Sequence, residues 1–140
     1  MPIIEGTRKA GGQGLGSPKP AYAVYDFATD GGAVGAITLR GDSIPSGAVI
    51  TDALLRVTTA LTGGTVTDTL SLGSEAATDL QSAAARNAAP WATTGAKRVT
   101  LTATAAPVLT TANRSLTFTV NGTDLTAGAF KLAVWYVELS

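Results

Sequence analysis

The sequence predicts an all-β protein, an antiparallel two-sheet sandwich or jelly roll with one short helix, preceded by an extended N-terminal arm. Threonine alternates with aliphatic residues in several segments, among them 65–72, 99–104 and 116–120. This period of two is typical of strands with one buried and one hydrated face. Glycine-rich turns separate such segments, and only 6% of the 140 residues are aromatic. The core is therefore expected to be thin and aliphatic, as between two packed sheets.

Residues 1–20 differ in composition from the rest of the chain, because glycines and prolines are interspersed there with Arg8, Lys9 and Lys19. Such a segment makes too few apolar contacts to offset its own ordering entropy. We expect 1–20 to be a flexible or extended arm and 21–140 to be one β-sandwich domain. Two interpretations of the arm stay open, namely a disordered tail and a segment that orders against a neighbouring subunit.

The strands are expected where bulky or apolar residues alternate with polar ones between turn signals. The expected strands are 21–28, 35–39, 49–61, 66–72, 98–104, 115–120 and 129–139. In the longest, the odd-numbered residues from Val49 to Leu61 are expected to share one face. Residues 40–47, which contain Pro45 and Gly47, are expected to form a loop.

One local signal predicts a hairpin. Gly63-Gly64 lies between two alternating segments and supplies the positive φ angles of a primed turn. The turn 62–65 is therefore expected to join strands 49–61 and 66–72 as antiparallel neighbours.

Another local signal predicts a helix within residues 74–89. Thr78 and Gln81 have the spacing of a capping box, and the alanine run 83–85 favours helix. Asn87 and Pro90 are suited to end it. We expect this short helix to lie across one end of the sandwich.

The composition excludes several classes of partner. Lys plus Arg and Asp plus Glu are both 10, so the formal net charge is zero, whereas direct nucleic-acid binding needs a basic field. The chain has no apolar run of the ~18 residues that span a membrane, and 1–5 has no signal-peptide pattern. We expect no membrane partner, and use in the cytosol or release by a route other than secretion. With 14% charged residues, the chain is better suited to an assembly than to a free monomer.

The sequence is poor in residues that carry catalysis. It contains no His and no Cys, so a Ser or Thr nucleophile has no imidazole base, and zinc and copper lack their usual ligands. The ten acidic residues form neither a spaced catalytic pair nor a calcium loop. The glycine-rich 11–16 lacks the Lys-Ser/Thr ending of a phosphate loop. We therefore expect no enzyme, no catalytic, cofactor-binding or metal-binding residues, and no cofactor.

Three short motifs are explained by turns. Arg40-Gly41-Asp42 spells an integrin-type tripeptide, and Asn113 and Asn121 begin glycosylation sequons. Each motif lies in a polar loop or turn, where these residue types are common.

The aromatic residues Tyr25, Trp91, Trp135 and Tyr136 are candidates for core or interface anchors, or for a sugar-stacking platform. Trp135 and Tyr136 are consecutive on an expected strand, so they point to opposite faces. One is expected in the core, and the other is expected to be covered by a neighbouring subunit or loop.

Four stretches carry a resemblance to a known group of proteins. They are Tyr25–Leu39, Ile44–Ala53, Leu61–Thr65 and Leu125–Phe130, and each combines strand residues with Gly-containing turns. The chain resembles, over most of residues 21–139, the small β-rich proteins encoded among tailed-bacteriophage head genes, that is, capsid decoration (cement) and minor capsid proteins. These motifs are turn and strand patterns, so no site residues are carried over.

The resemblance implies a virion protein on the outer surface of a phage capsid. Such a protein would bind the major capsid protein, often as a homotrimer where capsomers meet, and would stabilise the head non-covalently after assembly in the host cytoplasm. Two alternatives stay open: another virion component (tail, connector or fibre), and a carbohydrate- or host-surface-binding module. The latter would use Trp91 or the exposed member of Trp135 and Tyr136.

The arm can be tested by deletion of residues 1–20. We expect the truncated protein to keep its fold and to bind the capsid more weakly, because an arm that orders on binding adds contacts without supporting the core. Circular dichroism and co-sedimentation with capsids would measure the two properties. Undiminished capsid binding would refute the prediction.

Overall fold

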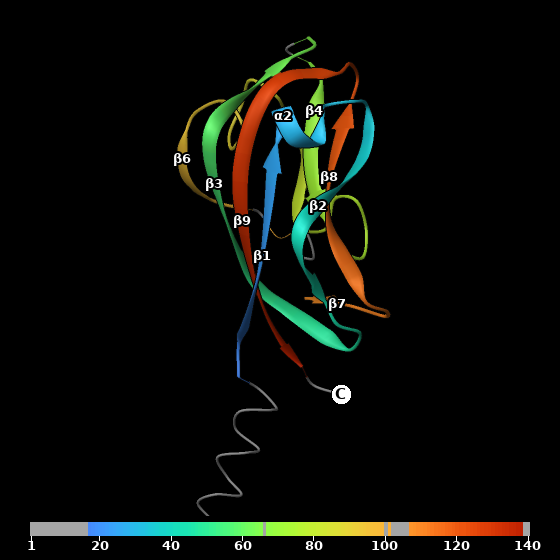
Figure 1. Ribbon diagram of the computed structural model, residues 1–140. Helices are drawn as coiled ribbons and strands as arrows, with labels where there is room; N and C mark the ends of the chain where they lie inside the picture. Colours follow the sequence, from blue (N-terminus) through green and yellow to red (C-terminus); the bar gives the residue numbers. More distant parts are fainter. Residues whose placement is uncertain (1–16, 66, 100, 102–106, 139–140) are drawn as a thin grey trace, which may run out of the picture.

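A computed structural model describes residues 17–65, 67–99, 101 and 107–138. In this part of the chain, nine strands form one antiparallel sheet that curls until its two halves face each other (Figure 1). The strands are β1 (Lys19–Asp26), β2 (Gly35–Ile44), β3 (Ala48–Gly63), β4 (Thr69–Gly73), β5 (Gln81–Ala85), β6 (Gly95–Arg98), β7 (Val108–Leu109), β8 (Arg114–Asn121) and β9 (Leu125–Glu138). The predicted all-β antiparallel fold class is confirmed.

The order of the strands is β5-β4-β8-β2-β1-β9-β3-β6, and β7 pairs with β3. We call β1, β9, β3, β6 and β7 the β9 half, and β5, β4, β8 and β2 the β8 half. The one helix of the described residues, α2 (Phe27–Asp30), follows β1, and the Asp26 carboxylate caps it by accepting from Ala28 N. It lies at the end of the molecule opposite the start of β1 (Figure 1).

Strand β2 is the corner that joins the two halves. It pairs with β8 near both of its ends and with β1 through Arg40 and Gly41. Gly41 has φ 136°, and a Cβ there would overlap the carbonyl oxygen of Tyr22. Only glycine permits this approach of two backbones. Asp42 adds a second link, because its carboxylate accepts from Tyr22 N at 2.9 Å.

Most strand predictions are confirmed, with changed bounds. Strands 115–120 and 129–139 correspond to β8 and to the longer β9, and residue 139 lies outside the described part. The prediction of a loop over 40–47 is wrong up to Ile44, because the corner keeps β2 paired. β6 ends at Arg98, where the strand 98–104 was expected to begin, and residues 100 and 102–106 of that strand are outside the described residues.

The predicted hairpin between strands 49–61 and 66–72 is wrong. β3 and β4 lie in different halves, because the end of β3 already pairs with β9 at Gly63 and Leu125, while β4 pairs with β5 and β8. Gly63 and Gly64 do have positive φ angles. They lie where the chain crosses from the β9 half to the β8 half, and not in a turn between two paired strands.

The helix predicted within 74–89 is also wrong. Residues 81–85 form β5, an edge strand on β4, and residues 74–80 form a loop around Asp79. The Asp79 carboxylate accepts from the backbone N–H of Ser74, Glu75 and Ala76 at 2.8 to 3.0 Å. Pairing with β4 outweighs the intrinsic helix preference of the alanine run, which is small per residue.

The predicted alternation in β3 is interrupted. Ala53, Leu55 and Val57 are buried, as expected for one face. The register against β9 shifts after Ile50, so Ile50 is buried and Thr51 is exposed. Such a bulge reverses the facing of every residue before it.

Four aromatic rings occupy the centre of the core. Tyr25 and Phe130 come from the β9 half, Phe118 from the β8 half, and Trp91 from the connection between β5 and β6. The centroids of the contacting rings lie 4.8 to 5.9 Å apart. The remaining buried apolar side chains are aliphatic. The predicted aliphatic core is therefore confirmed for the periphery, and it is wrong for the centre, which is aromatic.

The corner can be tested with two substitutions in β2. Gly41→Ala places a Cβ against Tyr22, whereas Gly35→Ala, at φ 123°, meets nothing within 4 Å. We expect Gly35→Ala to cost ~1 kcal/mol through backbone strain alone, and Gly41→Ala to cost ~1–3 kcal/mol more through overlap. Urea unfolding would measure both. Equal losses would contradict the close approach.

Candidate interaction surface

The described residues present no catalytic constellation. They contain no group of three or more acidic residues that could hold a metal ion. No helix of the described chain is long and apolar enough to cross a membrane. The candidate interaction surfaces are the two outer faces of the curled sheet, and several carboxylates brace the loops between the strands.

The outer face of the β9 half carries an apolar hollow centred on Ala133. The Cα partners of Ala133 are Tyr22 on β1 and Leu54 on β3, and Trp135 lies two residues along β9. Tyr22 and Leu54 are 57% and 39% exposed. A small residue ringed by large ones makes a depression of about 510 Å³, lined almost entirely by apolar atoms. We call this depression the Ala133 hollow.

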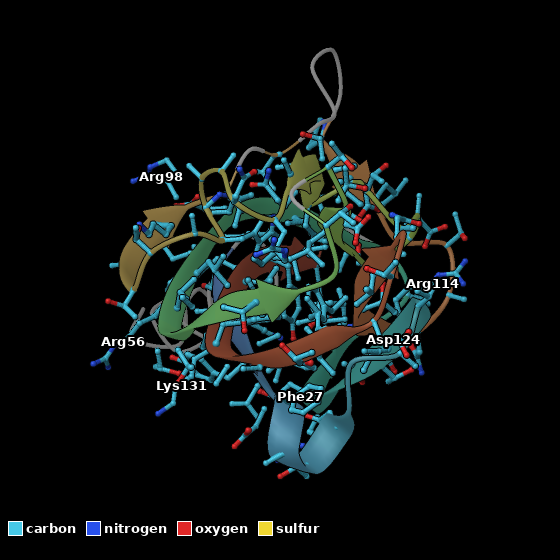
Figure 2. The ribbon with its side chains drawn as sticks, turned by 90° about the horizontal axis from the view of Figure 1, so that it is seen from above. Phe27, Arg56, Arg98, Arg114, Asp124 and Lys131 are labelled. Atoms are coloured by element: carbon cyan, nitrogen blue, oxygen red, sulfur yellow. The ribbon has the colours of Figure 1, made fainter. Side chains whose placement is uncertain are left out.

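Two cationic side chains lie at one edge of the hollow. Arg56 on β3 and Lys131 on β9 are direct cross-strand partners, both are exposed, and both line the hollow. Neither makes an ion pair within the described residues, whereas Arg98 on β6 pairs with Asp52 at 3.2 Å. Figure 2 shows Arg56 and Lys131 projecting outward from the same side of the molecule. The hollow is therefore apolar at its centre and positively charged at one edge.

The outer face of the β8 half is different in kind. Most of its exposed or half-buried residues are small and uncharged, such as Ala36, Thr38, Thr117 and Thr119, and the exposed Arg40 is paired with Asp30. On β4, the loop 74–80 covers this face, since a Cβ on Gly73 would overlap Ala76. This face is the threonine-rich one that the alternation predicts.

Asp68 braces the crossing between the halves. Its carboxylate accepts from the N–H and hydroxyl of Thr65 and from the N–H and hydroxyl of Thr123. The Thr123 hydroxyl and then the Thr65 N–H stabilise the anion most, so the pKa of Asp68 is lowered to about 2. The β8–β9 turn is thereby fastened to the β3–β4 crossing.

Glu75 fastens the loop 74–80 to the start of β8. Arg114 donates to both of its carboxylate oxygens at 2.6 and 3.1 Å, and Thr111 donates through its N–H and hydroxyl. These donors, Arg114 first, lower the pKa of Glu75 to about 2. Both Asp68 and Glu75 have structural partners within their own chain.

The aromatic candidates separate into core and surface residues. Tyr25 and Trp91 are buried in the ring cluster, and the Tyr25 hydroxyl donates to Gly31 O at 2.6 Å. Tyr136 packs against the core, while Trp135 lines the Ala133 hollow. The prediction that Trp135 and Tyr136 point to opposite faces is confirmed.

The short motifs take structural roles. Arg40 forms a two-point ion pair with Asp30 at 2.8 and 3.1 Å, and Gly41 and Asp42 build the corner. The Asn113 side chain accepts from Ser46 N at 3.0 Å. Asn121 ends β8 at the turn that Asp68 braces. The glycine-rich segment 11–16 lies outside the described residues.

The sequence interpretation missed the Ala133 hollow. Tyr22, Leu54 and Ala133 are far apart in the sequence, and their juxtaposition depends on the register of three strands. The available signal was the bulk on both faces of residues 21–28 and the apolar Leu54 on the face of 49–61 opposite the odd-numbered residues. In retrospect, those residues mark a face that water does not fully solvate.

Three solved chains from phage capsids share this fold. One is from the capsid asymmetric unit of cyanophage Pam1, with TM-score 0.63, 24% identity, and 89% of this chain and 86% of that chain covered. Another is from the acid-stable capsid of Helicobacter pylori bacteriophage KHP30, with TM-score 0.59, 20% identity, and 90% and 91% covered. A third is from the capsid of Ralstonia phage GP4, with TM-score 0.64, 21% identity, and 90% and 87% covered.

No protein-family model matches the chain, and no curated protein matches it. At these identities the structural likeness establishes the fold.

The carboxylate Glu75 predicts a defined acid dependence. Its folded pKa of about 2 lies below the ordinary value of 4.5, so its contribution to stability is complete above pH ~4.5 and is lost as pH falls towards ~2. Glu75→Gln should therefore destabilise the protein at pH 5–7, and this effect should shrink as pH falls through ~2. Urea unfolding between pH 2 and pH 7 would measure the difference.

A second variant tests the cause of the shift. Thr111→Val removes one hydroxyl donor to Glu75, which raises the folded pKa towards the ordinary value. The acid-dependent loss should therefore be smaller and should be complete at a higher pH than in the unmodified protein. The assignment of the acid dependence to Glu75 would be contradicted if the Glu75→Gln variant and the unmodified protein differed in unfolding free energy by the same amount at every pH from 2 to 7.

Proposed function

We propose that this chain is a structural protein of a phage virion, namely a decoration (cement) protein that binds the outer surface of the head and stabilises it non-covalently. The observation that carries the proposal is the fold shared with chains from three phage capsids. Enzymatic activity is no part of the proposed role.

The extent of the match supports a small capsid component. The alignments cover 86 to 91% of the capsid chains and 89 to 90% of this one, so the matched chains have similar lengths. The likeness is therefore between whole chains, and not between this chain and a domain of a much larger subunit.

The surface also supports a protein that works in an assembly. Its formal net charge is zero, and the Ala133 hollow leaves large apolar side chains in water. A specific interface buries ~1,600 Å² in total, and several such contacts made by one symmetric oligomer add avidity. The proposed partner is the major capsid protein, and the proposed oligomer is a trimer at points where capsomers meet.

The segment 1–20 is proposed as an arm that contributes to capsid binding. Lys19 and Pro20 belong to β1, where Lys19 pairs with Glu138 at 2.7 Å. A deletion of 1–16 therefore tests the arm without removing part of the sheet.

Other virion roles remain as alternatives. A tail, connector or fibre protein could use the same fold. A carbohydrate-binding role would depend on Trp135, because Trp91 is fully buried, and a glycan array without hits would count against it.

Copy number separates these roles. Quantitative mass spectrometry of purified particles should find this chain in hundreds of copies, near one third of or equal to the count of the major capsid protein. Decoration covers a shell with repeated sites, whereas a connector or fibre is built from a dozen copies or fewer. A count near a dozen, or absence from particles, would refute the decoration role.

A further inference from the structure

We propose that the Ala133 hollow is the surface that docks on the phage shell, and that its occupant is an apolar side chain of the major capsid protein flanked by carboxylates. This inference rests on the proposed function and names the contact through which it would act. It follows from the shape of the hollow, its charge, and the condition of the other surfaces.

The shape suits an inserted apolar side chain, and the volume of about 510 Å³ also leaves room for the groups beside it. Ala133 forms the floor, and Tyr22, Leu54 and Trp135 rise around it. Large apolar groups that surround a small one on a rigid strand provide an anchor pocket of the kind found at the centre of protein interfaces. The floor and two of the walls belong to β3 and β9, the longest strands of the sheet.

The charge specifies the chemistry beside that side chain. Arg56 and Lys131 are like charges placed directly opposite each other on neighbouring strands, an arrangement that is destabilising in the free protein. No acidic side chain of the described residues lies within ion-pair distance of either. A partner carboxylate would relieve the repulsion and complete the missing ion pairs.

A second copy of this chain is a poorer occupant. Every acidic side chain of the described residues is already engaged within its own chain, either in an ion pair or as the acceptor of a backbone or hydroxyl hydrogen bond. The residues are Asp26, Asp30, Asp42, Asp52, Asp68, Glu75, Asp79, Asp124 and Glu138. To pair with Arg56 and Lys131, these carboxylates would have to share or give up an existing partner, which favours carboxylates from a different protein.

The other surfaces offer no comparable anchor. The outer face of the β8 half carries mainly small uncharged side chains, its exposed Arg40 is already paired with Asp30, and the loop 74–80 covers its β4 region. The edge strands β5 and β6 have only five and four residues, too short for extensive strand addition. The β9 half is the face that combines depth, apolar character and unpaired charge, and Figure 2 shows Arg56 and Lys131 projecting from it.

The test uses the full chain and shells assembled from the major capsid protein of the source phage without this protein. Ala133→Phe fills the hollow, and its matched control is Ala36→Phe, at an exposed alanine on the β8 half. Arg56→Glu combined with Lys131→Glu reverses the charge, and its control is Ala36→Glu combined with Thr38→Glu. Thermal unfolding first establishes that each variant is folded, and co-sedimentation then measures binding to the shells.

We expect Ala133→Phe and the Arg56→Glu, Lys131→Glu variant each to weaken shell binding at least about tenfold. Both control variants should bind like the unmodified protein. Binding of the unmodified protein should also weaken as salt is raised, because exposed ion pairs are screened.

The outcomes separate this inference from the proposed function. If the unmodified protein does not bind the shells, the decoration role fails. If it binds and the Ala133→Phe variant binds equally well, the docking face is wrong while the decoration role stands. If Ala133→Phe instead dissociates an oligomer of this chain, or if deletion of 1–16 opens the hollow to an apolar dye, the occupant is a second copy or the arm, and the inference is overturned.

Discussion

The contact among Tyr25, Phe118, Phe130 and Trp91 holds the two halves of the sheet together. β2 joins the halves along one side, and the chain between β5 and β6 spans the other without completing a barrel. Trp91 comes from that connection and packs on Phe118 and Phe130, so aromatic packing takes the place of backbone pairing at the open seam. Ring contacts of this kind contribute ~0.5–1.5 kcal/mol each beyond simple burial, and they fix the spacing of the halves.

The remaining architecture follows from that spacing. With the inner face filled by rings and aliphatic side chains, each strand presents its alternate residues outward. On the β8 half those residues are mainly threonine and alanine, while on the β9 half they include Tyr22, Leu54 and Trp135. The same curl that completes the core therefore produces two outer faces of different chemistry, and the carboxylates of Asp68 and Glu75 fasten the loops that connect the strands.

Local patterns predicted what depends on neighbours in the sequence, and failed where the fold depends on distant partners. The alternation in 115–120 and 129–139 identified β8 and β9 because each strand has one buried face. The Gly63-Gly64 pattern predicted the positive φ angles correctly. It did not predict the partner strand, because the end of β3 pairs with β9 and not with β4. Helix preference in 83–85 was too weak to compete with an open edge on β4. The Ala133 hollow could not be predicted, because it requires the register of β1, β9 and β3 together.

The cross-strand pair of Arg56 and Lys131 also limits which surfaces can approach the Ala133 hollow. Two copies that approached each other through their hollows would bring four positive charges together, so this pairing is opposed before any apolar contact forms. The repulsion falls with distance over about a Debye length of ~10 Å at 0.1 M salt. The charges of Arg56 and Lys131 therefore oppose pairing of two copies through this face and leave it open to an acidic surface of complementary shape.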